Sequence, residues 1–150
     1  MFDAWSDATA EALVLANAAA ALVMTGLIWF VQIVHYPLLA GTPADRSTDV
    51  AAEHQRRTSY VVAVPMAVEG ITTLALLVDR PGDVALVWPW LGALLVAIAL
   101  GSTILLSVPL HARMALAFDP NTGPRLVLTN WPRTVAWTLH GVVGLVMLAP

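Results

Sequence analysis

Three of the four histidines in this chain stand at one end of long apolar stretches, where they could take part in chemistry. His35 ends the first stretch, His54 precedes the second and His111 ends the third. Gln32 lies one helical turn before His35, and Arg133 opens the fourth stretch. Imidazole is a proton acceptor near neutral pH and a common metal ligand, while arginine holds anionic or carbonyl groups. Brought together, these side chains could support acid–base or redox chemistry on a small molecule.

The residue types leave the cofactor unknown. His35, His54 and His111 are candidate ligands of a zinc, copper or iron ion, although they form no local ligand motif. Haem held between His35 and His111 is a further candidate, because these residues fall at matching depth on two helices. A di-iron carboxylate site needs several glutamates, and only Glu69 lies inside an apolar stretch. Without a metal, histidine could act as a base on an acidic C–H or O–H of a lipophilic phenol or quinone.

The composition indicates that a membrane holds these residues. Of the 150 residues, 59% are hydrophobic and 11% are charged, with a mean hydropathy of +0.77. Because a soluble domain carries about 25% charged residues, we expect a lipid bilayer to cover the apolar surface. The absence of cysteine excludes disulfides and thiolate metal sites. The absence of lysine and of a basic tail argues against a nucleic-acid partner.

Four apolar segments predict a single domain over residues 1–150, an all-α integral membrane protein built as an antiparallel four-helix bundle. The transmembrane helices are expected from about Ala12 to Tyr36, Tyr60 to Val78, Trp88 to Leu110 and Trp131 to Leu148. Connections containing Gly and Pro separate them. Thr42 followed by Pro43 predicts the start of the helix that includes the second span.

Arginine positions predict the orientation of the bundle. All but one of the arginines lie in or beside the first and third connections: Arg46, Arg56, Arg57, Arg113, Arg125 and Arg133. Only Arg80 lies in the second. Since cytoplasmic loops are enriched in arginine and lysine, we expect the chain in a bacterial inner (cytoplasmic) membrane with both termini outside.

This topology brings one set of polar residues to the cytoplasmic half of the bundle, as a candidate site. His35, His111 and Arg133 are the candidate catalytic residues. The candidate substrate-binding residues from spacing alone are Gln32, His54, Trp131 and Trp137. The tryptophans and Arg133 would hold aromatic rings.

A second polar layer is expected near the middle of the bilayer. Glu69 and His140 both lie roughly 13 Å past an interfacial aromatic residue, so we expect them to form an intramembrane pair that lowers the cost of burial. Thr25, Thr103 and Ser107 are expected to bond back to carbonyls of their own helices. Small residues are expected to let the helices approach closely: Ala18 to Ala21, Gly26, Gly92, Gly101, Gly141 and Gly144.

Four segments together resemble a group of uncharacterised bacterial four-helix membrane proteins: residues 29–37 (WFVQIVHYP), 54–58 (HQRRT), 108–111 (VPLH) and 129–134 (TNWPRT). The last two are also distantly similar to a domain family of unknown function that includes fungal anthrone oxygenases. There, a Pro-Leu-Asn segment ends the third span and an Asn-x-x-Arg-Thr segment opens the fourth. The resemblance implies an oxygenase-like bundle acting on an aromatic substrate without an evident cofactor. It points to Asn130, Arg133 and His111, although His111 stands where that family has asparagine.

Two kinds of function stay open from the sequence. The first is a small membrane enzyme, oxygenase-like or redox, acting on a lipophilic aromatic molecule or a quinone. The second is a non-catalytic accessory or scaffold subunit of a larger membrane complex or homo-oligomer, or a protein that binds haem or a metal. The first requires the polar residues above to meet around a cavity.

Overall fold

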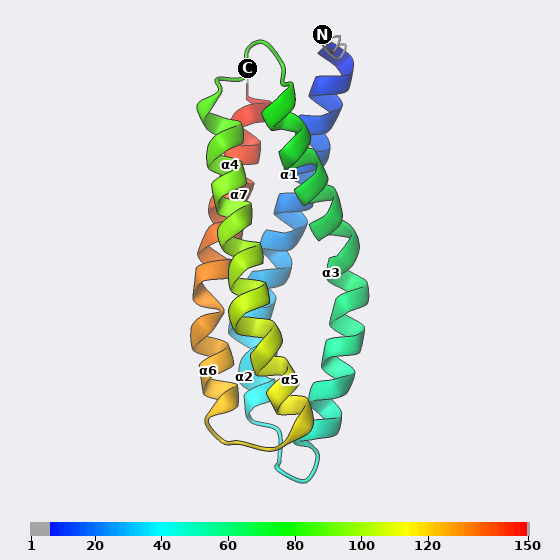
Figure 1. Ribbon diagram of the computed structural model, residues 1–150, viewed down its shortest axis with the longest axis vertical. Coiled ribbons are helices and arrows are strands. Elements are labelled where there is room, and N and C mark those ends of the chain that lie inside the picture. Colours follow the sequence, from blue (N-terminus) through cyan, green and yellow to red (C-terminus); the bar gives the residue numbers. More distant parts are fainter. Residues whose placement is uncertain (1–6, 150) are drawn as a thin grey trace.

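The structure, a computed structural model, describes residues 7–149, which are all-helical and contain no strand (Figure 1). The helices are α1 (Asp7–Phe30), α2 (Tyr36–Ala40), α3 (Ser47–Val78), α4 (Val87–Ser102), α5 (Val108–Leu116), α6 (Thr122–Thr129) and α7 (Trp131–Leu148). Two π-helical segments, η1 (Val31–His35) and η2 (Thr103–Ser107), join α1 to α2 and α4 to α5 without a break. The elements therefore form four long helical rods that lie side by side (Figure 1).

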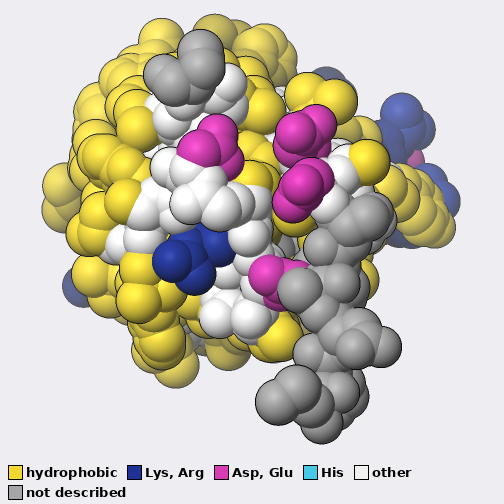
Figure 2. All heavy atoms as spheres, turned by 90° about the horizontal axis from the view of Figure 1, so that it is seen from above, with side chains coloured by type: hydrophobic (Ala, Val, Ile, Leu, Met, Phe, Trp, Pro, Cys, Tyr) yellow, Lys and Arg dark blue, Asp and Glu magenta, His cyan; other side chains and the backbone are white. Residues whose placement is uncertain are grey.

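Successive rods run in opposite directions, so the two described ends of the chain lie at the same end of the molecule (Figure 1). That end also carries the α3–α4 loop with Asp79, Arg80 and Asp83, and it shows charged side chains surrounded by apolar flanks (Figure 2). The opposite end, called here the arginine-rich end, carries Arg46, Arg113 and Arg125 in or beside its two loops. The charge asymmetry expected from the sequence therefore separates the two ends.

Three of the rods are long and apolar enough to cross a membrane: Asp7–Ala40, Ser47–Val78 and Val87–Leu116. Large apolar side chains such as Leu15, Val64 and Leu105 are exposed along them. The predicted fourth span, α7, is not among the three. It packs between α1 and α4 and includes Arg133 and His140, which lower its hydropathy.

The start of α3 differs from the prediction, because the helix begins at Ser47 and not at Pro43. Thr42 instead lies just after α2 and forms hydrogen bonds back to that helix. Its backbone N–H donates to the carbonyl of Leu39, and its hydroxyl donates to that of Leu38. Thr42 and Pro43 therefore belong to the connection, where the carbonyl of Pro43 accepts the N–H of Arg46.

The α5–α6 loop is fixed by Asp119. The backbone N–H of Asn121 and the hydroxyl of Thr122 both donate to its carboxylate. These bonds hold the pKa of Asp119 below its ordinary value. Because they favour the charged form, they stabilise the loop above the ordinary carboxyl pKa and are lost as the pH falls through the lowered one.

Close packing of α1 against α7 depends on glycine. A Cβ atom at Gly144 would lie 2.9 Å from the Cα of Ala18, and one at Gly141 would lie 3.0 Å from the Thr25 hydroxyl. Gly26 and Gly101, also expected at close approaches, face open space. Only some of the predicted small residues therefore bring helices together.

We expect Gly144→Ala to destabilise the protein by about 1–3 kcal/mol, because α1 must move away from the added methyl group. Gly26→Ala is the matched control. It adds the same methyl to a helix interior with nothing within 4 Å, so stability should be unchanged or slightly raised. Unfolding of the detergent-solubilised variants measures both, and equal midpoints would show that this contact tolerates expansion.

Candidate functional site

Two π-helical turns shape the first and third rods beside the predicted site residues. η1 ends two residues before Pro37, and η2 ends two residues before Pro109. Proline has no N–H to donate and clashes with the carbonyl four residues earlier, so a regular α-turn is unfavourable there. The wider turn avoids this conflict, and such turns are frequent at functional sites.

Arg133 is the centre of a buried hydrogen-bonded network. Its side chain donates through Nε to Asn130 Oδ1 (2.9 Å), through Nη1 to Thr103 Oγ1 (3.3 Å) and through Nη2 to the Tyr36 hydroxyl (2.9 Å). Nη2 also donates to Asn130 Oδ1. Only 6% of Arg133 is exposed. Residues of three rods hold this cation in the interior: Tyr36 in the first, Thr103 in the third and Asn130 in the fourth.

Asn130 extends this network to the first rod. Its amide donates to Gln32 Oε1 (2.8 Å) and to Thr134 Oγ1 (3.3 Å), and Gln32 Nε2 donates to the carbonyl of Val127 (3.2 Å). Asn130 is completely buried and Gln32 is nearly so. These amides fix the position of Asn130, which in turn orients the guanidinium group.

The three predicted histidines form a second cluster beside Arg133. His35 Nε2 lies 2.6 Å from His54 Nδ1, and the rings of His54 and His111 pack with centroids 4.8 Å apart. His111 Nε2 lies 2.8 Å from the Tyr36 hydroxyl. Because Tyr36 accepts from Arg133, its own proton can go to His111 Nε2, and in that arrangement the hydrogen of a neutral His111 ring is on Nδ1.

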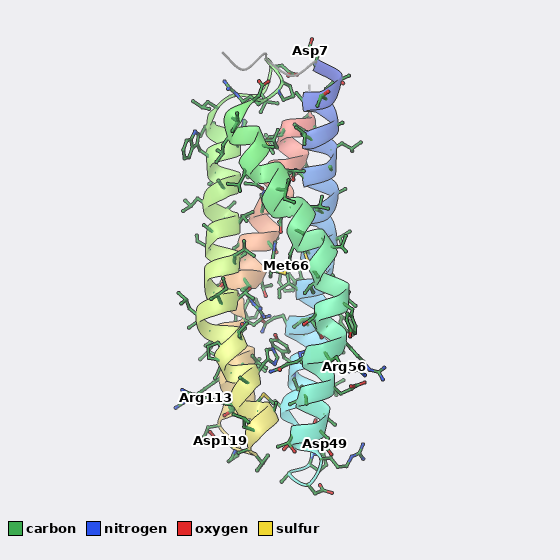
Figure 3. All side chains as sticks on the ribbon, turned by 45° about the vertical axis from the view of Figure 1, so that its right-hand side comes forward. Asp7, Asp49, Arg56, Met66, Arg113 and Asp119 are labelled. Atoms are coloured by element: carbon green, nitrogen blue, oxygen red, sulfur yellow. The ribbon has the colours of Figure 1, made fainter. Side chains whose placement is uncertain are left out.

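A cavity of about 300 Å³ lies between these clusters and the middle of the bundle. Its apolar walls are Met24, Leu27, Ile28, Val31, Val62 and Met66. Met66 sits at mid-length on α3 (Figure 3). The polar end of the cavity is formed by five residues, Tyr36, His54, Ser107, His111 and Arg133. An apolar chamber with a few convergent polar groups is the usual form of a small-molecule site.

Residues of α3 and α5 that are not fully buried line part of the cavity, namely Gln55, Ser59, Val108 and Ala112. α3 contacts α4 and α5 but has little contact with η2, which lies between them. The cavity therefore lies beside η2, whose residues Thr103 and Ser107 line it.

Two polar atoms beside the cavity lack partners among the described residues: His111 Nδ1 and Ser107 Oγ. The prediction that Ser107 bonds back to its own helix is therefore wrong, whereas Thr103 does bond to the carbonyl of Ala99 and Thr25 to that of Ala21. A buried donor without a partner costs about 1–3 kcal/mol.

The deeper polar layer is one connected group. Glu69 Oε1 lies 2.6 Å from His140 Nδ1, and Glu69 Oε2 accepts from Trp137 Nε1 at 2.8 Å. The side chains of Glu69 and His140 are each 1% exposed. Asn17 donates to the hydroxyls of Thr72 and Thr73 at 2.9 Å each. Trp137 also lines the cavity, so it links this layer to the site.

The geometry does not fit the metal and haem candidates. Two nitrogens on one tetrahedral zinc lie about 3.3 Å apart, but His35 and His54 are directly hydrogen-bonded at 2.6 Å. Over the described part of the chain, no group of three or more ligand side chains is arranged to hold a metal ion. His111 Nε2 is engaged by Tyr36, so axial haem ligation would need this bond to break.

The structure brings most predicted site residues together, with one exception. Gln32, His35, His54, His111, Asn130 and Arg133 join the two clusters, and Trp137 lines the cavity. Trp131 does not: it is 40% exposed and packs edge-on against Trp29. Its indole therefore lies outside the cavity lining and is not positioned to hold a substrate ring there.

Tyr36 is the main site residue that the sequence reasoning missed. It is 4% exposed and joins Arg133 to His111. Its place directly before Pro37 was the available signal, since that proline favours a distorted turn. Asn17, isolated in an apolar stretch, was a similar signal for the deeper layer.

No family model, no curated protein and no solved structure matches this chain. The residues of the site must therefore carry the functional argument.

Proposed function

We propose that this chain is a four-span integral membrane protein of the bacterial inner membrane, with both termini outside and the arginine-rich end in the cytoplasm. Arginine placement supports this orientation. α7 is proposed as the fourth span despite its lower hydropathy. Its 18 residues cover about 27 Å. Its polar residues Arg133, Thr134 and His140 are buried, while Leu139, Val142 and Leu145 are exposed.

We further propose that the cavity binds a lipophilic aromatic molecule, a phenol or a quinone, that enters from the bilayer between α3 and α5. The observation that supports this proposal most directly is that the cavity has apolar walls and, at one end, two polar groups without a described partner, His111 Nδ1 and the Ser107 hydroxyl. A ring would contact Met24, Met66 and Trp137, and its oxygen would accept hydrogen bonds from His111, Ser107 or Arg133. Such donors favour developing negative charge on that oxygen.

The proposed chemistry is oxygenase-like or redox, with dioxygen or the bound quinone as the electron acceptor, and its proton transfer centres on His111. The imidazole could move a proton between the substrate oxygen at Nδ1 and Tyr36 at Nε2. Arg133 would stabilise the resulting charge, and the apolar walls would exclude water. Gln32 and Asn130 keep Arg133 in place. The alternative, an accessory subunit without chemistry, gives no reason for buried donors without partners next to a cavity.

Quinone binding tests the proposal. We expect decylubiquinone and menadione to quench tryptophan fluorescence saturably in nanodiscs, because Trp137 lines the cavity. His111→Ala should weaken binding by about tenfold or more through loss of a buried donor. Arg113→Ala is the matched control on the same helix, since Arg113 points away from the bundle (Figure 3). Absence of saturable binding, with stable co-purification in a larger complex, would favour the accessory subunit.

A further inference from the structure

Arg133 is a buried cation whose charge has no counter-ion among residues 7–149. Its described partners are Asn130, Thr103 and Tyr36, which are all neutral. A buried charge without an opposite charge is costly, more so within a bilayer. Neutral hydrogen bonds orient the guanidinium group but do not cancel its charge.

The nearby carboxylates are engaged elsewhere. Glu53 directly precedes His54, but it pairs with Arg56 at 2.7 Å and Arg57 at 2.5 Å on the exposed face of α3. Figure 3 shows Arg56 directed away from the bundle. Glu69 pairs with His140 in the deeper layer. The described residues thus include acids close to the site in sequence, yet none of them pairs with Arg133.

The groups at the polar end of the cavity are predominantly donors. Arginine has five N–H bonds, and four of those of Arg133 are used by Asn130, Tyr36 and Thr103. One N–H on Nη1 stays free, and two further atoms of the residues that line the cavity, His111 Nδ1 and Ser107 Oγ, have no described partner. His111 is 9% exposed and Ser107 is 1% exposed. A neutral ligand would satisfy the donors but leave the positive charge.

We infer that the cavity holds its ligand as an anion, with a single oxyanion, phenolate or carboxylate, paired to Arg133 and an apolar body in the chamber. This inference rests on the proposed function and narrows its substrate class to an acidic lipophile. The oxyanion accepts from Arg133, His111 and Ser107, and charge-assisted bonds of this kind are about twice as strong as neutral ones. Arg133 then becomes one half of a buried ion pair.

The test compares an acid with its neutral isostere. Purified protein in nanodiscs of phosphatidylcholine is titrated calorimetrically with 4-octylbenzoate and with 4-octylbenzamide, and empty nanodiscs supply the partition blank. We expect the acid to bind at least about tenfold more tightly than the amide. Equal affinities in the wild-type protein overturn the inference, whereas saturable binding of decylubiquinone would leave the proposed function intact.

Two variants assign the preference to Arg133. Arg133→Gln removes the charge, and Asn130→Asp leaves Arg133 in place but gives it an internal counter-ion of nearly the same shape. Both should abolish the preference for the acid, and Arg113→Gln should retain it. If Arg133→Gln does not fold, Asn130→Asp decides. A preference that persists in Asn130→Asp contradicts the assignment.

Two further arms identify the source of the oxyanion. Tetradecanoate with its amide tests an aliphatic acid, and added phosphatidylglycerol tests a lipid headgroup. Stronger binding of the benzoate than of tetradecanoate, without competition from phosphatidylglycerol, supports an aromatic acid. Competition by phosphatidylglycerol would assign the same oxyanion site to a phospholipid. If neither acids nor quinones bind, the proposed function itself fails.

Discussion

Glu69→Ala is expected to destabilise the folded protein by about 3–5 kcal/mol, because it leaves buried polar partners without their acceptor. The carboxylate lies 2.6 Å from His140 Nδ1 and accepts from Trp137 Nε1 at 2.8 Å, and both partners are almost fully buried. His140 Nε2 already lacks a described partner. The variant would therefore leave the whole imidazole unsatisfied. Unfolding of the detergent-solubilised protein measures the loss.

Two controls on the same helix interpret this result. Glu69→Gln keeps an oxygen for Trp137 and an N–H for His140, so it should lose much less stability than Glu69→Ala. Glu53→Ala removes an exposed glutamate that pairs with Arg56 and Arg57, and exposed pairs of this kind contribute little. Similar unfolding midpoints for Glu69→Ala and Glu53→Ala would show that the buried group does not hold α3 to α7.

Counting residues along the helices was enough to place the deeper layer. Glu69 and His140 were assigned to one depth from the rise per residue alone, and in the structure they are in contact. This worked because α3 is continuous from Tyr60 to Glu69 and α7 is continuous from Trp131 to His140. A constant rise converts sequence separation into depth. The four long apolar stretches likewise predicted the four helical rods.

Helical periodicity was less reliable at the arginine-rich end. An α-helix turns by about 100° per residue, and this value does not apply across the π-helical segments η1 and η2. Tyr36 and Ser107 lie at the ends of these segments, where Tyr36 is buried in the network and Ser107 has no partner in its own helix. Pro37 and Pro109 signal such distortions, but they do not specify how far the chain rotates.

The cavity itself could not be predicted from the sequence. It lies between residues of α3 and of η2, two elements with few direct contacts. No residue pattern encodes that arrangement directly. Trp131 shows the same difficulty, since its position at the start of α7 fits either the site or the contact with Trp29 that is observed. Both the cavity and the position of Trp131 depend on how the rods pack against one another.

Val62→Trp is expected to weaken quinone binding by about a hundredfold or more, which corresponds to about 2.7 kcal/mol. Val62 lines the cavity on α3 and packs against the buried cluster that contains Met24, Ile28 and Trp137. An indole at this position would occupy space that the proposed ligand needs. The decylubiquinone titration in nanodiscs measures the effect.

Val64→Trp separates blockage of the cavity from a general effect of tryptophan. Val64 is two residues further along α3 and is 68% exposed, so the same substitution there should leave binding unchanged. Overpacking a filled core usually costs about 1–3 kcal/mol, but Val62→Trp enters open space and should retain most of the stability. Loss of binding with a preserved unfolding midpoint would therefore locate the ligand between α3 and α5. Wild-type affinity in Val62→Trp would instead exclude this cavity as the binding site, and with it the role assigned to His111.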